Sequence, residues 1–172
     1  MKRWWVLFAL VFATTVCAAW PALSSLGGGQ IPELLKTPSH GERIIMFWAL
    51  SCAYCEPNMK VLATVQRAHP QDIELVTVAT DDISAHGAAI EKRLSQAGMA
   101  GYAAWAYTEP TPQRLNFLID PNWGGETPRT IFILSNGERA AVSGELTHTE
   151  LDQLWPLPMS QADAVAKGHV VD

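Results

Sequence analysis

The chain has 172 residues, of which 48% are hydrophobic and 17% are charged, and its formal net charge at pH 7 is −5. This length fits one domain with its own hydrophobic core and is short for two ordinary domains. Nucleic-acid binding depends on clustered Lys and Arg, and an acidic chain has no electrostatic basis for it. We therefore expect a single folded domain that has no nucleic-acid partner.

The N-terminus has the pattern of an export signal. A short basic start, Met1-Lys2-Arg3, is followed by an apolar run from Trp4 to about Ala13. Smaller residues follow, and Val16-Cys17-Ala18 is acceptable as a cleavage region. We predict that residues 1–19 form a signal peptide or a membrane anchor. The protein would then act in the periplasm or another exported space.

The sequence leaves two variants of export open. The apolar run from Trp4 to Leu23 is about long enough to span a bilayer uncleaved, as a tether. Cys17 is the other variant, as a lipidated residue, but the bulky Val16 fits a lipoprotein cleavage site badly. The exported domain is therefore expected to be either soluble after cleavage or tethered by its N-terminal segment.

Composition also suggests the limits of the folded domain. Residues 20–30 contain Gly27-Gly28-Gly29 and are predicted to be a flexible spacer. The domain is expected over residues 31–155. Two prolines, Pro156 and Pro158, then break any helix, and residues 156–172 are predicted to be a C-terminal tail.

Within the domain, strand and helix patterns alternate along the chain. Strands are predicted at 43–48, 73–79, 102–107, 130–134 and 139–143. Helices are predicted from Cys55 to about 69, from Asp81 or Asp82 to Gly98, over 112–118 and over 147–155. A tight hairpin turn is expected at Asn136-Gly137. This order predicts an α/β fold with a mixed central sheet and helices on both faces.

Cys52 and Cys55 form a CxxC pair between a predicted strand and a predicted helix. A cysteine at a helix N-terminus is favoured as a thiolate by the unpaired N–H groups and the helix dipole, and the thiolate is the attacking species in disulfide exchange. Cys52 is therefore the expected nucleophile, and Cys55, one turn further on, the resolving thiol. If the leader is removed, these are the two cysteines that remain.

Three other roles for the CxxC pair are less favoured by the sequence. Half of a zinc site is disfavoured because the sequence has no second CxxC and no pair of His at ligand spacing. A static disulfide would close a very small ring and constrain the unfolded chain little. A haem attachment site needs His directly after the second cysteine, where Glu56 stands. We expect no metal ligand and no cofactor other than the redox-active Cys52–Cys55 disulfide.

Two segments resemble a known group of proteins. The run from Ile45 to Cys55 resembles the active-site strand and turn of thioredoxin-fold proteins, most closely the TlpA-like exported reductases. The run from Gly125 to Ile133 resembles the loop of that fold in which a cis-proline precedes a strand. The resemblance covers roughly residues 31–155 and implies a thioredoxin fold. It also implies that Thr127 and cis-Pro128 lie against the CxxC pair and bind the substrate backbone.

Two aromatic residues near the cysteines are further candidates for substrate binding. Trp48 ends the predicted active-site strand, where it could line a substrate groove or pack beside the turn. Tyr54 stands between the two cysteines, where exposure and contact with a partner are plausible.

The residues around the CxxC pair leave the direction of electron flow open. Ser51 stands where thioredoxins usually have Trp, and Asn58 stands where TlpA-like reductases often have Glu. The dipeptide Ala53-Tyr54 and the residue Thr127 are closer to the DsbC-type isomerases. Because the intervening dipeptide tunes thiolate stability, these differences bear on whether the pair reduces or oxidises its partners.

The sequence thus predicts an exported thiol–disulfide oxidoreductase that exchanges disulfides with other exported proteins, as a reductase. Its expected partners are exported protein thiols and disulfides, together with a membrane electron donor or acceptor. A disulfide oxidase or isomerase is the alternative enzyme. A thioredoxin-fold metallochaperone or binding module is the alternative without catalysis.

Overall fold

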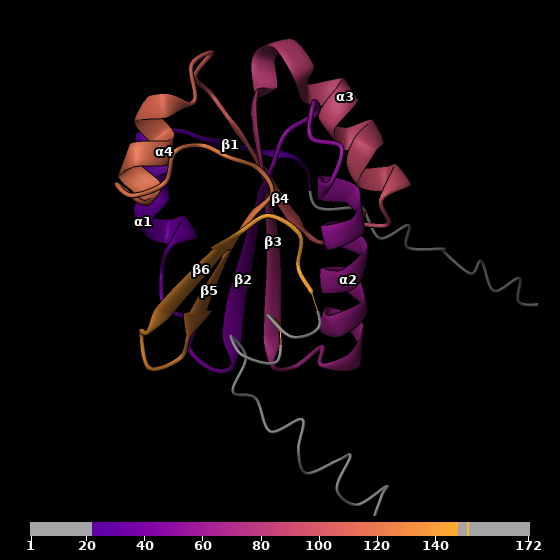
Figure 1. The fold of residues 1–172 in the computed structure, drawn as a ribbon, viewed down its shortest axis with the longest axis vertical. Coiled ribbons are helices and arrows are strands. Elements are labelled where there is room, and N and C mark those ends of the chain that lie inside the picture. Colours follow the sequence, from indigo (N-terminus) through magenta and orange to yellow (C-terminus); the bar gives the residue numbers. More distant parts are fainter. Residues whose placement is uncertain (1–21, 148–150, 152–172) are drawn as a thin grey trace, which may run out of the picture.

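The computed structural model describes residues 22–147 and residue 151. Within them the chain forms a six-stranded sheet and four α-helices (Figure 1). The strands are β1 (Ser24–Leu26), β2 (Glu42–Trp48), β3 (Ile73–Asp82), β4 (Ala103–Tyr107), β5 (Arg129–Leu134) and β6 (Arg139–Ser143). The helices are α1 (Ile31–Leu34), α2 (Cys55–Ala68), α3 (Ile83–Gln96) and α4 (Gln113–Ile119), with a short 3₁₀-helix, η1 (Gly28–Gln30), before α1.

The sheet is mixed, as predicted, and its strand order is β1-β4-β3-β2-β5-β6. β1, β4, β3 and β2 run parallel to one another, whereas β5 is antiparallel to β2 and β6 is antiparallel to β5. The turn at Asn136-Gly137 joins β5 to β6, and Gly137 has the positive φ that such a turn needs. The parallel strands require helical crossovers, and these crossovers place the helices on the sheet faces.

Both faces of the sheet are covered, and alternate residues of β2 point into two separate cores. Ile44, Met46 and Trp48 join the core under α2 and α3, together with Met59, Leu62, Ile90 and Leu94. Ile45 and Phe47 join the core under α1 and α4, together with Leu34, Leu115 and Ile119. A central strand that is buried on both faces accounts for the continuous apolar run in its sequence.

β3 is three residues longer than the sequence predicted. The predicted strand ends at Ala79, whereas the observed strand continues to Asp82, and its register against β4 shifts between these two residues. The side chain of Asp82 then accepts a hydrogen bond from the Ser84 N–H and caps α3, as expected for one of the two aspartates. The extension carries Thr80 and Asp81 to the end of the sheet from which the CxxC turn emerges.

The segment before the domain is partly structured. The flexible spacer predicted over residues 20–30 is instead structured over Ser24–Leu26, which form β1, and over Gly28–Gln30, which form η1. β1 pairs in parallel with β4, with Ser24 opposite Trp105, and the side chain of Leu26 is completely buried in the core under α1 and α4. The folded unit therefore begins before the predicted boundary at residue 31.

The predicted leader (residues 1–19) and the predicted tail (156–172) lie outside the described residues. The predicted last helix, 147–155, lies largely outside them too. Of that helix the structure describes Thr147 and Leu151, and the Leu151 N–H donates a hydrogen bond to the Thr147 carbonyl, as in a helical turn.

The burial of Leu26 gives a test of where the folded domain begins. Leu26→Ala is expected to lower the free energy of unfolding by about 2–5 kcal/mol, because it leaves a cavity in the core under α1 and α4. Ser25→Ala, on the exposed side of the same strand, is the control and should change it by less than about 0.5 kcal/mol. Urea unfolding of the two variants measures the difference. Equal and negligible effects would mean that this segment is a spacer after all.

Candidate active site

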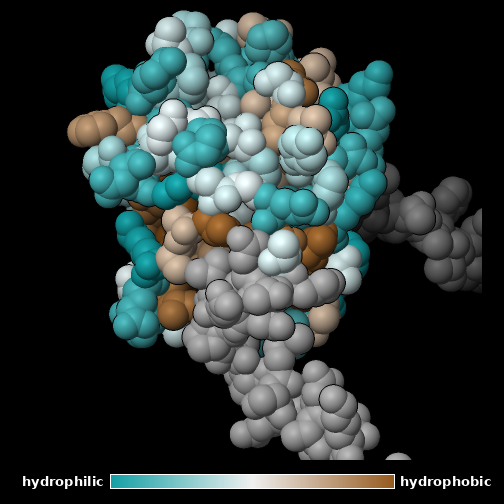
Figure 2. Space-filling model, viewed as in Figure 1, coloured by the Kyte–Doolittle hydropathy of each residue, from teal (hydrophilic) through white to brown (hydrophobic). Residues whose placement is uncertain are grey.

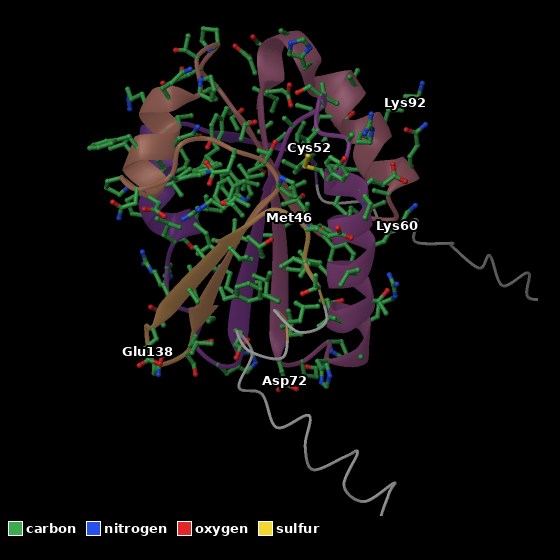
Figure 3. All side chains as sticks on the ribbon, in the orientation of Figure 1. Met46, Cys52, Lys60, Asp72, Lys92 and Glu138 are labelled. Carbon is green, nitrogen blue, oxygen red and sulfur yellow. A yellow bond between two sulfur atoms is a disulfide. The ribbon has the colours of Figure 1, made fainter. Side chains whose placement is uncertain are left out.

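The two motifs found in the sequence meet at one end of the sheet. β2 leads at its carboxyl end into the CxxC turn, and β5 begins directly after Pro128. The two strands are antiparallel neighbours, and Phe47 lies opposite Arg129 in their register. Figure 3 shows Cys52 at this end of the sheet, while Asp72 and Glu138 mark the opposite end. Pairing of β2 with β5 therefore brings Trp48 beside Pro128.

Cys52 and Cys55 are joined in a disulfide, and their Cα atoms lie 5.5 Å apart. α2 begins at Cys55, with Tyr54 as its N-cap residue, so Cys52 lies in the turn just before the helix rather than on its first residue. The Cys52 N–H donates to the Ala49 carbonyl at 3.0 Å, which closes this turn. The predicted start of this helix at Cys55 is confirmed, and Cys52 stands just before the helix N-terminus.

The two cysteines differ in burial. Cys52 is 9% exposed and Cys55 is 1% exposed, so a partner reaches Cys52 first. The first N–H groups of α2 have no carbonyl partner within the helix, and they give this end of the helix a partial positive charge. A thiolate next to the helix start is thereby favoured. The arrangement fits attack by Cys52 followed by resolution by Cys55.

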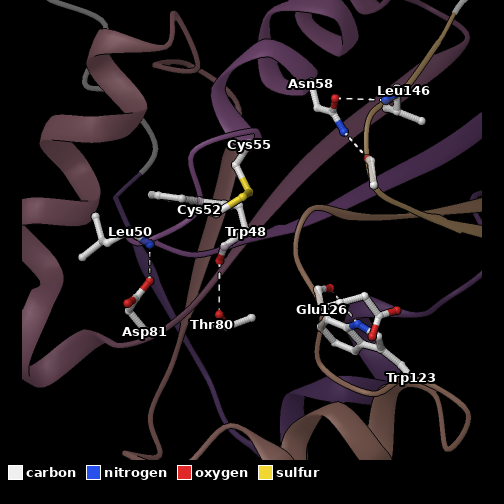
Figure 4. Close-up of a disulfide and its surroundings, with 11 residues drawn as sticks. Trp48, Leu50, Cys52, Cys55, Asn58, Thr80, Asp81, Trp123, Glu126 and Leu146 are labelled. Atoms are coloured by element: carbon white, nitrogen blue, oxygen red, sulfur yellow. Dashed lines mark hydrogen bonds between the residues drawn. A yellow bond between two sulfur atoms is a disulfide. The ribbon is translucent and has the colours of Figure 1, made fainter.

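Side chains from the end of β3 fix the loop that leads into Cys52 (Figure 4). The Leu50 N–H donates to Asp81 Oδ2 at 2.8 Å, and Thr80 Oγ1 donates to the Trp48 carbonyl at 3.3 Å. Both bonds connect residues 31 or 32 positions apart in sequence. The backbone between β2 and Cys52 is thus held by the strand beside it and not only by its own turn.

The peptide bond between Thr127 and Pro128 is cis, as the resemblance implied. Pro128 is buried and Thr127 is partly exposed. The preceding loop is held by the indole N–H of Trp123, which donates to the Glu126 carbonyl at 2.9 Å. Gly125 has a φ of +92°, and a Cβ there would lie 2.7 Å from Nδ2 of Asn116, so the loop has room for glycine alone at this position.

Arg129, the residue after Pro128, connects this loop to its surroundings. Its guanidinium makes ion pairs with Asp120 and Glu126 and donates to Ser143 Oγ on β6. It also lies over the Trp123 ring, 5.7 Å from the ring centroid. The Ser143 hydroxyl donates to the Glu126 carboxylate, and this hydrogen bond is the main reason that the pKa of Glu126 is lowered. The cis-proline loop is therefore a fixed surface at the end of the sheet from which the CxxC turn emerges.

The two aromatic candidates occupy different environments. Trp48 is 1% exposed and belongs to the core that also contains both cysteines, so direct contact with a partner does not fit its position. We assign its ring to packing below the disulfide. Tyr54 is 70% exposed and remains free to contact a partner. The face in Figure 2 is mainly hydrophilic, with apolar groups in small separate areas.

Sequence reasoning missed the role of Asn58, which it noted only as a departure from a Glu. Asn58 is buried on α2, one turn after Cys55. Its Nδ2 donates to the Gly144 carbonyl at 2.8 Å, and its Oδ1 accepts from the Leu146 N–H at 3.0 Å (Figure 4). These bonds join the active-site helix to the segment after β6, which is 86 and 88 residues away in sequence.

Two carboxylates with shifted pKa values, Glu56 and Glu42, lie at different distances from the thiols. Glu56 forms an ion pair with Lys60 at 2.8 Å, and the hydrogen bond from Lys60 is the main cause of its lowered pKa. Glu42 is buried, and burial raises its pKa to about 7. It stands at the start of β2, however, at the opposite end of the strand from Trp48, roughly 20 Å away at the usual rise per strand residue. Glu42 is therefore too far away to exchange protons with Cys52.

Among residues 22–147 and 151, no group of three or more His, Cys, Asp or Glu side chains is arranged to hold a metal ion. None of the helices in this part of the chain is long and apolar enough to cross a membrane.

These features define a thioredoxin fold, with a CxxC turn after a central strand and a cis-proline before the antiparallel neighbour. No protein-family model matches the chain, and no curated protein matches it by sequence. Solved structures of this fold do match it.

A secreted Mycobacterium tuberculosis disulfide oxidoreductase, homologous to E. coli DsbE, is 18% identical over 66% of this chain and 78% of its own, with a TM-score of 0.51. A DsbF homologue from Corynebacterium diphtheriae is 19% identical over 66% of this chain and 69% of its own, with a TM-score of 0.52. A thioredoxin-like protein in its oxidised form is 14% identical over 66% of this chain and 74% of its own, with a TM-score of 0.52. At these identities the likeness establishes the fold.

Asn58 offers a test of how the active-site helix is held. Asn58→Ala should lower the free energy of unfolding by about 1–3 kcal/mol, because the buried Leu146 N–H and the Gly144 carbonyl lose their partner. Asn122→Ala, at an exposed position in the loop after α4, is the control and should have little effect. Chemical unfolding monitored by circular dichroism compares the two. An Asn58→Ala chain as stable as the control would contradict the assigned role.

Proposed function

We propose that the protein is an exported thiol–disulfide oxidoreductase that reduces disulfides in other exported proteins. The observation that carries the proposal is the pairing of a more accessible Cys52 with a buried Cys55 at the start of α2. The cis Thr127–Pro128 bond beside them gives the same site a second feature of thioredoxin-fold redox proteins.

The proposed reaction begins with the reduced pair. The Cys52 thiolate attacks one sulfur of a partner disulfide, a new bond forms between Cys52 and that sulfur, and the other partner sulfur leaves as a thiolate. The Cys55 thiol loses its proton and attacks Cys52 Sγ. This attack breaks the mixed disulfide and releases the partner sulfur that was bonded to Cys52. The two electrons of the dithiol then reside on the partner, and the chain carries the Cys52–Cys55 disulfide.

Three residues are proposed to bind the partner during this exchange. Thr127 and Pro128 belong to a loop that Trp123 and Arg129 hold in place, so an extended partner segment would meet a surface that is already formed. Such preorganisation lowers the ordering cost of binding. The exposed Tyr54 would contact the partner next to the sulfur under attack.

Turnover as a reductase requires electrons, and we propose a thiol donor at the membrane. Support for export comes from the sequence of residues 1–19, which has the basic start and apolar run of a leader. A disulfide oxidase or isomerase is the second candidate, and Ala53-Tyr54 together with Thr127 favour it. The two candidates differ in the reduction potential of the Cys52–Cys55 pair, which for an oxidase lies well above roughly −200 mV.

Insulin reduction by a thiol donor tests the proposed activity. The chain should accelerate it, and Cys52→Ser should reduce the rate to that of the donor alone, because no attacking thiolate remains at the accessible position. Cys17→Ser, which alters the cysteine outside the CxxC pair, is the control and should keep the full rate. Unchanged activity of the Cys52→Ser chain would remove Cys52 as the nucleophile.

A further inference from the structure

We propose that Asp81 is a positioning residue for the active-site turn, and that its negative charge makes the Cys52–Cys55 pair more reducing. This inference rests on the proposed function and names a residue that biases the pair toward reduction of its partners. Asp81 lies neither in the CxxC motif nor in the cis-proline loop. It reaches the site because β3 extends past Ala79 and changes its register against β4 there.

Asp81 contacts the active-site loop through a hydrogen bond to its backbone. Oδ2 of Asp81 accepts the Leu50 N–H at 2.8 Å (Figure 4). Leu50 is two residues before Cys52, and consecutive Cα atoms are about 3.8 Å apart, so the carboxylate lies within roughly 12 Å of the Cys52 backbone. The hydrogen bond from the Cys52 N–H to the Ala49 carbonyl folds this stretch into a turn, which shortens the separation further.

The charge of this carboxylate acts on the Cys52 thiolate. The carboxylate and its partner Leu50 are both only partly exposed, so the interaction is screened less than it would be in bulk water. A negative charge at this distance disfavours a second negative charge on Cys52 Sγ. It therefore opposes the helix α2 N-terminus, which favours the thiolate. A less stable thiolate makes the reduced pair a better reductant, because oxidation to the disulfide removes the destabilised thiolate.

Other charged groups surround the turn, and most are already paired. On α2, Glu56 is bound to Lys60, and Arg93 of α3 also acts on Glu56. In the cis-proline loop, Glu126 is bound to Ser143 and Arg129. At the start of α3, Asp82 caps the helix and lies near His86. Asp81 differs from all of these because its carboxylate is bonded to the backbone of the active-site loop.

The substitution Asp81→Asn separates the charge from the hydrogen bond. Asn keeps a carbonyl oxygen that can accept the Leu50 N–H, but it has no charge. Asp81→Ala removes both. Asp82→Asn is the matched control, because it removes the same charge one residue further along the chain, from a side chain that is not bonded to the loop.

The readout is the pH dependence of Cys52 alkylation by iodoacetamide, which reports on the thiolate without any turnover. The full chain carries Cys17→Ser and Cys55→Ser, so that Cys52 is its one remaining thiol. Asp81→Asn should move the midpoint of alkylation down by about half a pH unit. This shift corresponds to the Coulomb energy between two unit charges about 10–12 Å apart in a medium of intermediate dielectric constant. Asp82→Asn should move it by less than half as much.

A second measurement uses the intact pair, in the chain with Cys17→Ser alone. The chain is equilibrated with glutathione at a pH above the midpoint of alkylation. Asp81→Asn should then raise the ratio of dithiol to disulfide up to threefold, which is equivalent to about 15 mV for a two-electron couple. Circular dichroism confirms that each variant is folded. Asp81→Ala should show the same direction of shift and, in addition, slower insulin reduction, because the loop is no longer anchored.

The outcomes separate this inference from the proposed function. The role of Asp81 is overturned if the midpoint of alkylation in a folded Asp81→Asn chain stays the same or rises. It is also overturned if that midpoint moves no more than it does in Asp82→Asn. Insulin reduction that survives Cys52→Ser overturns the proposed function instead, whatever the Asp81 variants do.

Discussion

The antiparallel pairing of β2 with β5 is the constraint on which the rest of the site depends. It fixes the carboxyl end of one central strand next to the amino end of its neighbour, with Phe47 opposite Arg129. The CxxC turn therefore emerges beside Pro128, although about 75 residues separate the two motifs. Because β2 is buried on both faces, a shift of its register would displace two cores at once, and the geometry at the strand end is held accordingly.

Much of this arrangement follows from local sequence patterns. The apolar run of β2, the Asn136-Gly137 turn and the CxxC pair are each determined by residues close together in the chain, and the sequence predicts them. It also predicts that one of two aspartates, Asp81 or Asp82, caps α3, and the structure shows Asp82 in that role. The cis bond before Pro128 was predicted only through resemblance, since the physical preference of an X-Pro bond is for trans. The order of strands and helices was sufficient to predict a mixed sheet with helices on both faces.

The features that the sequence did not predict all depend on distant contacts. β1 has three residues, Ser24, Ser25 and Leu26, and no periodicity of its own, so it resembled a linker until its pairing with β4 buried Leu26. Asn58 acquires its role from backbone groups at Gly144 and Leu146. Trp48 is buried because the elements that cover both faces of β2 extend to the end of the strand, and an aromatic side chain at a strand end has no local signal that decides this.

The central claim is that Cys52 attacks and Cys55 resolves, and trapping the mixed disulfide tests it most directly. The Cys55→Ser chain, reduced and then mixed with oxidised insulin, cannot complete the exchange. We predict a covalent adduct that mass spectrometry places on Cys52 and that a reducing agent releases. An adduct formed equally well by the Cys52→Ser chain through Cys55, or no adduct on Cys52, would contradict the claim.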